Sequence, residues 1–251
     1  MFEPEALTCD GFLGGALQIW QPIKGYRAAM DSVLLAAVVP AKAGQSVLEL
    51  GCGAGVASLC LARRVSGLFS FGVERQVDYA NLARQNATEN GLNFTVETAD
   101  LENMPANLRC AFDHVIFNPP YFLSQRGTRG QDPGREEALR EETSTQAWID
   151  AATRRLAPGG RLHLIQSADR LPEILSAIDG RLGAVTLLPL APRQGRAAKR
   201  FILMAQKGAR SPFTLRAPFI IHKGENHMAD VPDYTAQAEK ILRHGAPLNF
   251  E

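Results

Sequence analysis

Apolar runs of strand length alternate with segments of helical period through most of this 251-residue chain. Strand-like runs occupy residues 46–50, 68–74, 94–100 and 112–118, and helical patterns occupy residues 56–65 and 77–90. Such alternation is typical of an α/β fold, because each helix returns the chain so that successive strands run parallel. The pattern therefore predicts a doubly wound, mostly parallel, Rossmann-like sheet.

The later part of the chain closes the predicted sheet in a different way. A helix capped by Thr143 or Ser144 stops at "PGG", residues 158–160, before a strand over 161–166 and a further helix over 171–182. The runs "AVTLLPL" and "RFILMAQ" then follow each other with no helix between them. Strands connected in this way pair in opposite directions, so the two runs predict an antiparallel terminal hairpin.

The loop "GCGAG" joins the first predicted strand to the first predicted helix. Gly51, Gly53 and Gly55 are spaced G-x-G-x-G, and Val56 stands where a dinucleotide fingerprint needs its third glycine. Glycines at this place let the backbone approach a ligand closely, so the loop favours a nucleoside without a pyrophosphate. A glycine-rich turn that binds no ligand is the alternative.

Two acids end neighbouring predicted strands. Glu74 ends the second strand, where an acidic side chain in such folds accepts hydrogen bonds from ribose hydroxyls, and Asp100 ends the third. Because the carboxyl ends of parallel strands meet at one edge of a sheet, we expect both acids beside the glycine loop. Taken singly, each is also typical of a solvated acid at the end of a strand.

The fourth strand leads into the motif Asn118, Pro119, Pro120 and Tyr121. Together with the glycine loop and the two acids, this motif resembles the class I S-adenosylmethionine-dependent methyltransferases that methylate amines. The resemblance implies S-adenosylmethionine as cofactor, with Glu49 in its site. It also implies that Asn118 and a proline carbonyl accept hydrogen bonds from a planar NH₂ group, while Tyr121 stacks on the target base. Two such acceptors hold the N–H bonds so that the lone pair points at the methyl group.

The segment "GYRAAMDSVLLAA", residues 25–37, is similar to that of the tRNA (adenine-N6)-methyltransferases that modify the adenine 3′ of the anticodon in a valine tRNA. In that family the segment covers the cofactor, which implies Tyr26, Arg27 and Asp31 as lid residues. Asp31 has a second interpretation as the N-cap of a helix. We expect residues 1–45 to form an N-terminal extension and cofactor lid, and residues 46–251 to form the methyltransferase domain of one compact unit.

A basic segment near the end of the chain bears on the substrate. Residues 193–223 hold eight Lys or Arg and no acid, although the net charge of the whole chain is only +1. Such a segment can neutralise phosphates, so tRNA is the expected partner, with contacts at Arg193, Arg196, Lys199 and Arg200. A solvated strand face is the alternative. Residues 123–142, with three glycines and nine charged side chains, predict a mobile loop beside the same site.

Two other functions stay open at this point. A protein-glutamine N5-methyltransferase acting on release factors resembles this chain in the same motif, but it usually carries a separate helical N-terminal domain. Only 45 residues precede the first predicted strand, so we expect that domain to be missing. The other alternative is a non-catalytic RNA-binding protein of the same fold.

Composition limits the remaining classes. The first residues have neither a basic start nor an apolar segment, and no apolar run approaches the length that spans a membrane. The four cysteines have neither CxxC spacing nor the spacing of metal ligands. We therefore expect a cytoplasmic protein with reduced thiols, no metal and no membrane contact, and its oligomeric state is left open.

Overall fold

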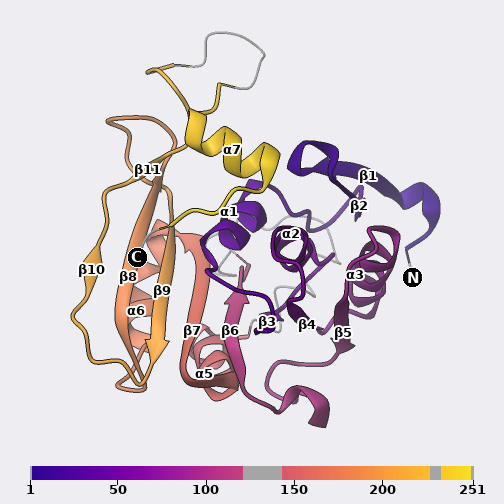
Figure 1. The fold of residues 1–251 in the computed structure, drawn as a ribbon, viewed down its shortest axis with the longest axis horizontal. Helices are drawn as coiled ribbons and strands as arrows, with labels where there is room; N and C mark the ends of the chain where they lie inside the picture. Colours follow the sequence, from indigo (N-terminus) through magenta and orange to yellow (C-terminus); the bar gives the residue numbers. More distant parts are fainter. Residues whose placement is uncertain (1, 121–142, 227–232, 250–251) are drawn as a thin grey trace, which may run out of the picture.

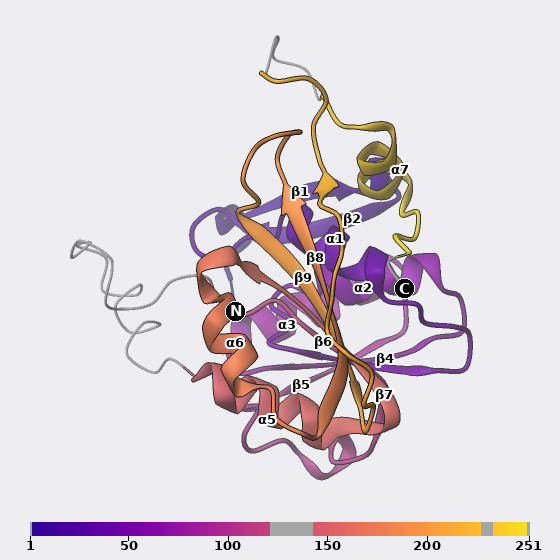
Figure 2. The same ribbon diagram turned by 90° about the vertical axis from the view of Figure 1, so that its left-hand side faces the viewer.

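One mixed nine-stranded sheet forms the centre of the molecule (Figure 1). The computed structural model describes residues 2–120, 143–226 and 233–249. The sheet order is β10-β8-β9-β7-β6-β3-β4-β5, with β11 also paired to β8. Its strands are β3 (Ser46–Leu50), β4 (Phe69–Glu74), β5 (Phe94–Thr98), β6 (Phe112–Phe117), β7 (Leu156–Ser167), β8 (Leu182–Ala191), β9 (Arg200–Lys207), β10 (Thr214–Leu215) and β11 (Phe219–Ile220). Figure 2 shows the strong twist between the β4–β5 end and the β8–β9 end.

Strand direction follows the prediction from the sequence. The neighbours from β5 to β7 all pair in parallel, whereas β9 is antiparallel to both β7 and β8. The predicted fold class, a doubly wound and mostly parallel α/β sheet with an antiparallel terminal hairpin, is therefore confirmed. Because β8 is parallel to β7, the connection from β8 to β9 lies at the same edge as the carboxyl ends of β6 and β7.

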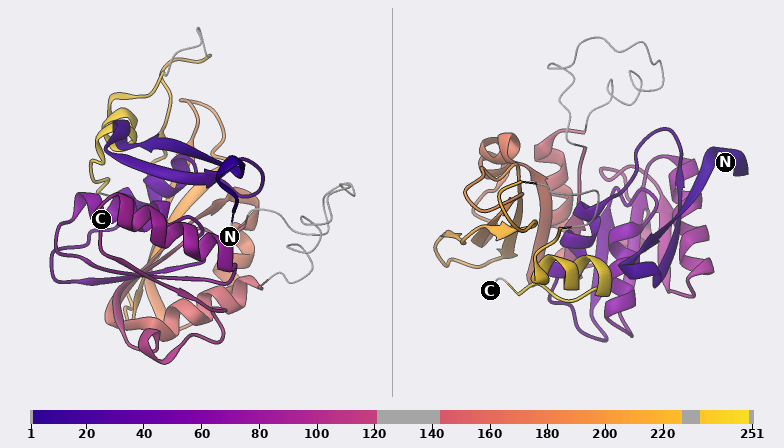
Figure 3. Two further views of the ribbon diagram at one scale, coloured as in Figure 1. Left: turned by 90° about the vertical axis from the view of Figure 1, so that its right-hand side faces the viewer. Right: turned by 90° about the horizontal axis from the view of Figure 1, so that it is seen from above.

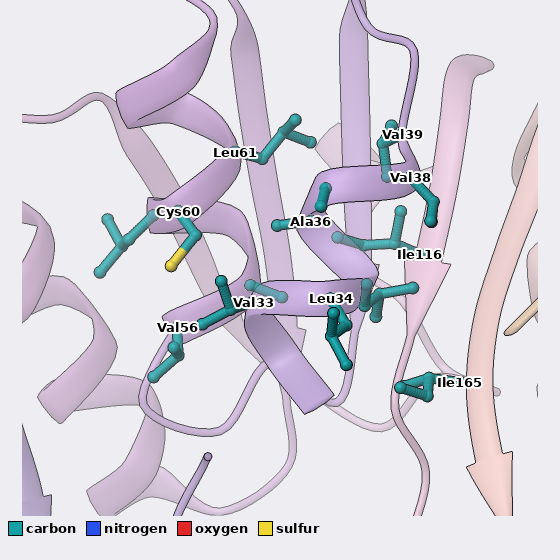
Figure 4. Close-up of a cluster of buried hydrophobic side chains, with 14 of the residues drawn as sticks. Val33, Leu34, Ala36, Val38, Val39, Val56, Cys60, Leu61, Ile116 and Ile165 are labelled. Atoms are coloured by element: carbon teal, nitrogen blue, oxygen red, sulfur yellow. The ribbon is translucent and has the colours of Figure 1, made fainter. Parts of the chain in front are cut away.

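Helices cover both faces of the sheet. One apolar cluster joins α1 (Met30–Val38), α2 (Val56–Arg64), α3 (Val77–Glu89) and α7 (Ala236–His244) to one face, and a second joins α5 (Thr145–Arg155) and α6 (Leu171–Ala177) to the other. The alternation along β6 shows the division, because Ile116 belongs to the first cluster and Val115 to the second. Figure 4 shows Ile116 and Ile165 beside the side chains of α1, with the labelled side chains of α2 on the other side of that helix.

Two element boundaries differ by several residues from the predicted ones. Strand β7 begins at Leu156 and not at residue 161. Its pairing with β6 shifts register between Phe112 and His114, and this irregularity lets the strand continue through the glycines of "PGG". Helix α6 ends at Ala177 and not at residue 182. There Asp179 turns the chain, since its carboxylate accepts from the Arg181 backbone N–H at 2.9 Å.

The N-terminal residues form a separate antiparallel hairpin, which the sequence pattern did not predict. Strands β1 (Leu7–Phe12) and β2 (Leu17–Pro22) pair only with each other. Asn86 of α3 anchors β2, because its Oδ1 accepts from Trp20 N at 2.8 Å and its Nδ2 donates to Trp20 O at 3.1 Å. Figure 3 shows the hairpin lying across the helical layer rather than in the main sheet.

None of the helices in the described part of the chain has the length and apolar character needed to cross a bilayer.

Candidate active site

Four neighbouring parallel strands bring the predicted site residues to one edge of the sheet. The glycine loop follows β3, Glu74 ends β4, and Asn118 follows the last residue of β6. Asp100 does not end the third strand as predicted, because β5 ends at Thr98, and Asp100 lies in the turn two residues later. Since these strands are adjacent in the order β6-β3-β4-β5, the four features lie side by side at their carboxyl ends.

The glycine loop has backbone conformations that side chains rarely adopt. Gly51, Gly53 and Gly55 have φ angles of 60°, 53° and 85°. Space is also missing at Gly51, because a Cβ atom there would lie 2.5 Å from Cη2 of Trp148 on α5. Trp148 also packs against Phe117 in a tilted arrangement, with ring centroids 5.4 Å apart. This wall of the site was not expected from the sequence, because α5 lies far along the chain.

Glu74 fastens the glycine loop to β4. Its Oε2 accepts from Gly53 N at 2.9 Å, and its Oε1 accepts from Gln76 N at 2.9 Å. The side chain is 7% exposed, so the alternative of a solvated strand-end acid is wrong for Glu74. A carboxylate has about four acceptor positions. Two hydrogen bonds therefore leave capacity for hydroxyl donors of a ligand.

Glu49 is buried beneath the same loop. It accepts from the backbone N–H of Ser58 at 3.0 Å and from the Ser58 hydroxyl at 2.5 Å. Burial raises the pKa of Glu49 to about 7, and the hydrogen bonds from Ser58 act in the opposite direction. The structure therefore gives Glu49 a clear local role at the first turn of α2, next to the loop that a cofactor would contact.

Asp100 shapes the turn after β5. Its Oδ1 accepts from Glu102 N at 2.8 Å, and its backbone carbonyl accepts from Asn103 N at 3.0 Å. The residue is half-buried, and its carboxylate keeps further acceptor positions at the same sheet edge.

Tyr26 links the glycine loop to the Asn-Pro-Pro motif. A Cβ atom placed on Gly53 would lie 3.4 Å from the Tyr26 ring, so the ring covers the loop. The Tyr26 hydroxyl accepts a hydrogen bond from Asn118 Nδ2 at 3.3 Å, and its backbone carbonyl accepts from the Tyr79 hydroxyl at 2.9 Å. Desolvation of the hydroxyl, with Glu49 nearby, raises the pKa of Tyr26 to about 12. Tyr26 therefore stays neutral over the physiological range.

Arg27 donates its hydrogen bonds to the N-terminal hairpin and not to the glycine loop. It donates to Thr8 Oγ1 at 2.8 Å and Pro22 O at 2.7 Å, and it forms an ion pair with Asp10 at 2.5 Å. These contacts fix the segment that carries Tyr26.

Asp31 lies in the first turn of α1, is 8% exposed and forms an ion pair with Arg200 Nε at 3.0 Å. The alternative of a helix N-cap at Asp31 is wrong, because the N-cap residue is Ala29.

The Asn-Pro-Pro segment leaves the sheet at the end of β6. Asn118 is half-buried, and both prolines are held through their carbonyls by Gln166, whose Nε2 lies 3.2 Å from Pro119 O and 3.3 Å from Pro120 O. Gln166 was not expected from the sequence, although a polar residue ending the buried run "LHLIQ" beside β6 is a signal that could have found it. Tyr121 and the loop over residues 123–142 lie outside the described residues.

The four predicted RNA-contact residues fall into two pairs. Arg193 forms an ion pair with Asp233, and Arg200 pairs with Asp31, so both charges are partly neutralised. Arg196 and Lys199 are exposed on the connection from β8 to β9. That connection lies at the same sheet edge as the candidate site, because Ala168, just after β7, donates from its N–H to the Lys199 carbonyl at 2.9 Å.

Comparisons with known proteins find one family model, several curated relatives and several solved structures that are similar to this chain. Residues 27–188 match the model of the methyltransferase small domain. A protein of Porphyromonas gingivalis named tRNA1(Val) (adenine(37)-N6)-methyltransferase is 31% identical over 230 residues, which are 85% of this chain and 87% of that protein. A protein of the same name from Aeromonas hydrophila is 28% identical over 211 residues, 81% and 86% of the two chains.

Among solved structures, an Agrobacterium tumefaciens protein described as a predicted O-methyltransferase aligns with a TM-score of 0.72 and 28% identity, over 88% of this chain and 100% of that chain. A Thermus thermophilus 16S rRNA N2 G1207 methyltransferase, solved with AdoMet and guanosine, shares the fold with a TM-score of 0.54 and 22% identity, over 80% of this chain and 50% of that one.

Proposed function

Because the chain belongs to the class I S-adenosylmethionine-dependent methyltransferases with a methyltransferase small domain, we propose that it methylates an exocyclic amine, N6 of the adenine next to the anticodon in a tRNA. The observation that carries the proposal is the hydrogen bond between Asn118 and Tyr26, because it sets the amine-binding motif directly beside the glycine loop. The names of the relatives support adenine in tRNA as the target.

The residues at the sheet edge fit S-adenosylmethionine. The loop at Gly51 and Gly53 offers backbone at close range, and the buried Glu74 has free acceptor positions for ribose hydroxyls. Asp100 would accept from the adenine amine, and Tyr26 would close over the cofactor, with residues 1–45 acting as its lid. When bound there, the cofactor supplies an electrophilic methyl group on a sulfonium.

Asn118 and Pro119 would hold the target amine. The Asn118 Nδ2 group is engaged by Tyr26, so its Oδ1 is the atom left to accept from a substrate N–H. Pro119 O would accept the second N–H. Two fixed acceptors orient the amine and direct its lone pair out of the ring plane, towards the methyl donor. Tyr121 would stack on the base.

Arg196 and Lys199 would contact tRNA phosphates beside this site. Both are exposed and lie on the connection that follows β8 at the catalytic edge. Arg193 and Arg200 would contribute less than the sequence indicated, because Asp233 and Asp31 already pair with them. A tRNA substrate also makes the cytoplasm the expected compartment.

Methyl transfer from labelled S-adenosylmethionine tests the proposal. The wild-type protein is incubated with an unmodified valine tRNA transcript or with purified release factor. Label in the tRNA, located by nuclease mapping and mass spectrometry to N6 of the adenine 3′ of the anticodon, is the expected result. Label only in the release factor would instead indicate a glutamine methyltransferase. Label in neither substrate would favour a non-catalytic RNA-binding protein.

A further inference from the structure

Gln166 is a buried amide beside the amine-binding motif. It lies at the carboxyl end of β7, the parallel neighbour of β6, and is 2% exposed. A buried amide is costly unless its polar atoms find partners. Its Oε1 accepts from Ser167 N at 2.7 Å, which leaves Nε2 as the group that faces the motif. Nε2 donates to Pro119 O and Pro120 O.

The proline motif has few other ways to be fixed. The pairing between β6 and β7 ends at Phe117 and Leu164, so Asn118 and the prolines lie beyond the ladder. Prolines also have no N–H to donate. Their carbonyls are therefore the backbone groups by which the motif can be attached, and both are attached to Gln166.

We propose that Gln166 is a positioning residue for methyl transfer, which holds the Pro119 carbonyl at the angle where its second lone pair meets the substrate amine. The inference rests on the proposed function, because it assumes an amine substrate at Asn118 and Pro119. A carbonyl oxygen has two lone pairs, so one hydrogen bond from Gln166 leaves one for the substrate. Tyr26 holds Asn118 from the other side, so each acceptor has its own support.

The consequence concerns rate more than affinity. A misplaced acceptor fails to orient the amine at the moment of transfer, whereas the glycine loop, Glu74 and the exposed basic residues stay in place. Such a displacement of about 1 Å can cost about 100-fold in rate. Loss of Gln166 should therefore lower kcat, with little change in cofactor affinity or in the KM for the substrate.

Gln166→Met tests this inference, because it removes the amide and keeps a similar length. Gln206→Met is the matched control: Gln206 lies on β9 opposite Arg161 and also donates to a backbone carbonyl, that of Gly159 at 2.9 Å, but at the other end of the strands. For Gln166→Met we expect kcat to fall about 10- to 100-fold, with the cofactor Kd and substrate KM within about threefold of wild type. Gln206→Met should stay close to wild type.

Gln166→Glu gives a pH dependence of kcat that would not be expected if Gln166 only filled space. A protonated carboxyl can donate one hydrogen bond to the proline carbonyls, whereas a carboxylate donates none and repels them. The ratio of Gln166→Glu to wild-type kcat should therefore rise as the pH falls, and the same ratio for Gln166→Met should stay flat. This nearly isosteric variant also decides the question if thermal melting shows that Gln166→Met does not fold.

The outcomes separate this inference from the proposed function. All rates are measured on whichever substrate the wild type labels, tRNA or release factor, since both present a planar NH₂. A kcat for Gln166→Met within about twofold of wild type would overturn the role of Gln166 and leave the methylation proposal standing. A pH-independent ratio for Gln166→Glu would overturn it as well. A wild type that labels neither substrate would overturn both.

Discussion

Glu74 shapes the glycine loop, and in the proposed function it also accepts hydrogen bonds from the cofactor. Because both of its oxygens accept from backbone N–H groups, Glu74→Ala should loosen the loop as well as remove an acceptor. We expect S-adenosylmethionine binding to weaken by about 1 to 3 kcal/mol, the scale of hydrogen bonds to a charged group. Isothermal titration calorimetry measures this, with Glu97→Ala on the neighbouring strand as control. An unchanged affinity would remove Glu74 from the cofactor site.

A substitution of Asn118 should lower the rate of methyl transfer without changing the affinity for the cofactor. The proposed acceptor Oδ1 acts on the target amine, so Asn118→Ala should lose about 100-fold or more in kcat, as expected for a group that orients the reacting atoms. Calorimetry should find the cofactor still bound. Asn107→Ala, at an exposed amide that donates to Glu97 at 2.6 Å, is the control and should keep full activity. Normal turnover by Asn118→Ala would contradict the proposed mechanism.

The connection between β8 and β9 carries the prediction about RNA. The double variant Arg196→Ala/Lys199→Ala should weaken tRNA binding and reduce the salt slope by up to about 2, roughly one unit for each phosphate that is no longer neutralised. Arg63→Ala/Arg243→Ala removes the same charge as a matched control. Those two side chains line one cavity at the C-terminal turns of α2 and α7, and α2 runs away from the glycine loop. Filter binding across a salt series measures the salt slope of tRNA binding for each double variant. Equal slopes for the two variants would show that Arg196 and Lys199 lie on a solvated face and do not contact phosphates.

The individual elements also show which features a sequence pattern can predict. Strands β3 to β6 and helices α2 and α3 were predictable because each has its own apolar pattern, and α3 also ends at the Asn90–Gly91 signal. The hairpin of β1 and β2 was missed because partners distant in sequence hold it, above all Asn86. Gln166 was missed for the same reason, because its partners are also distant in sequence. The ion pairs that Asp31 and Asp233 form with two of the predicted RNA contacts likewise join distant parts of the chain.

At the level of the whole molecule, two histidines among the described residues are buried within the sheet. His114 on β6 is 4% exposed and His163 on β7 is 0% exposed, with ring centroids 5.6 Å apart. Among the described residues, neither ring nitrogen of His163 has a hydrogen-bond partner. Desolvation lowers the pKa of His114 to about 4 and lowers the pKa of His163 well below its usual range. The folded protein therefore holds both rings neutral. This lowers the free energy of unfolding at pH values where the histidines of the unfolded chain bind protons.

The sign of the pH dependence follows from the protons bound in each state. Between about pH 6.5 and pH 4 the unfolded chain binds a proton at His114 and the folded protein does not, so the free energy of unfolding falls as the pH falls. Glu49 acts in the opposite sense, because its raised pKa of about 7 makes the folded state bind the extra proton. Only a difference between wild type and a histidine variant isolates the contribution of His114, since the contribution of Glu49 cancels.

His114→Gln should therefore gain stability relative to wild type as the pH is lowered. The free energy of unfolding of the variant minus that of wild type should increase by about 2 kcal/mol between pH 7.5 and pH 5. This value follows from a His114 pKa near 6.5 in the unfolded chain and near 4 in the folded protein. Urea unfolding at a series of pH values measures this difference. His244→Gln, at an exposed position in the last turn of α7, is the control and should not reproduce the shift. A stability difference for His114→Gln that stays constant with pH would show that the buried ring titrates alike in both states, and acid sensitivity would then have to arise elsewhere in the molecule.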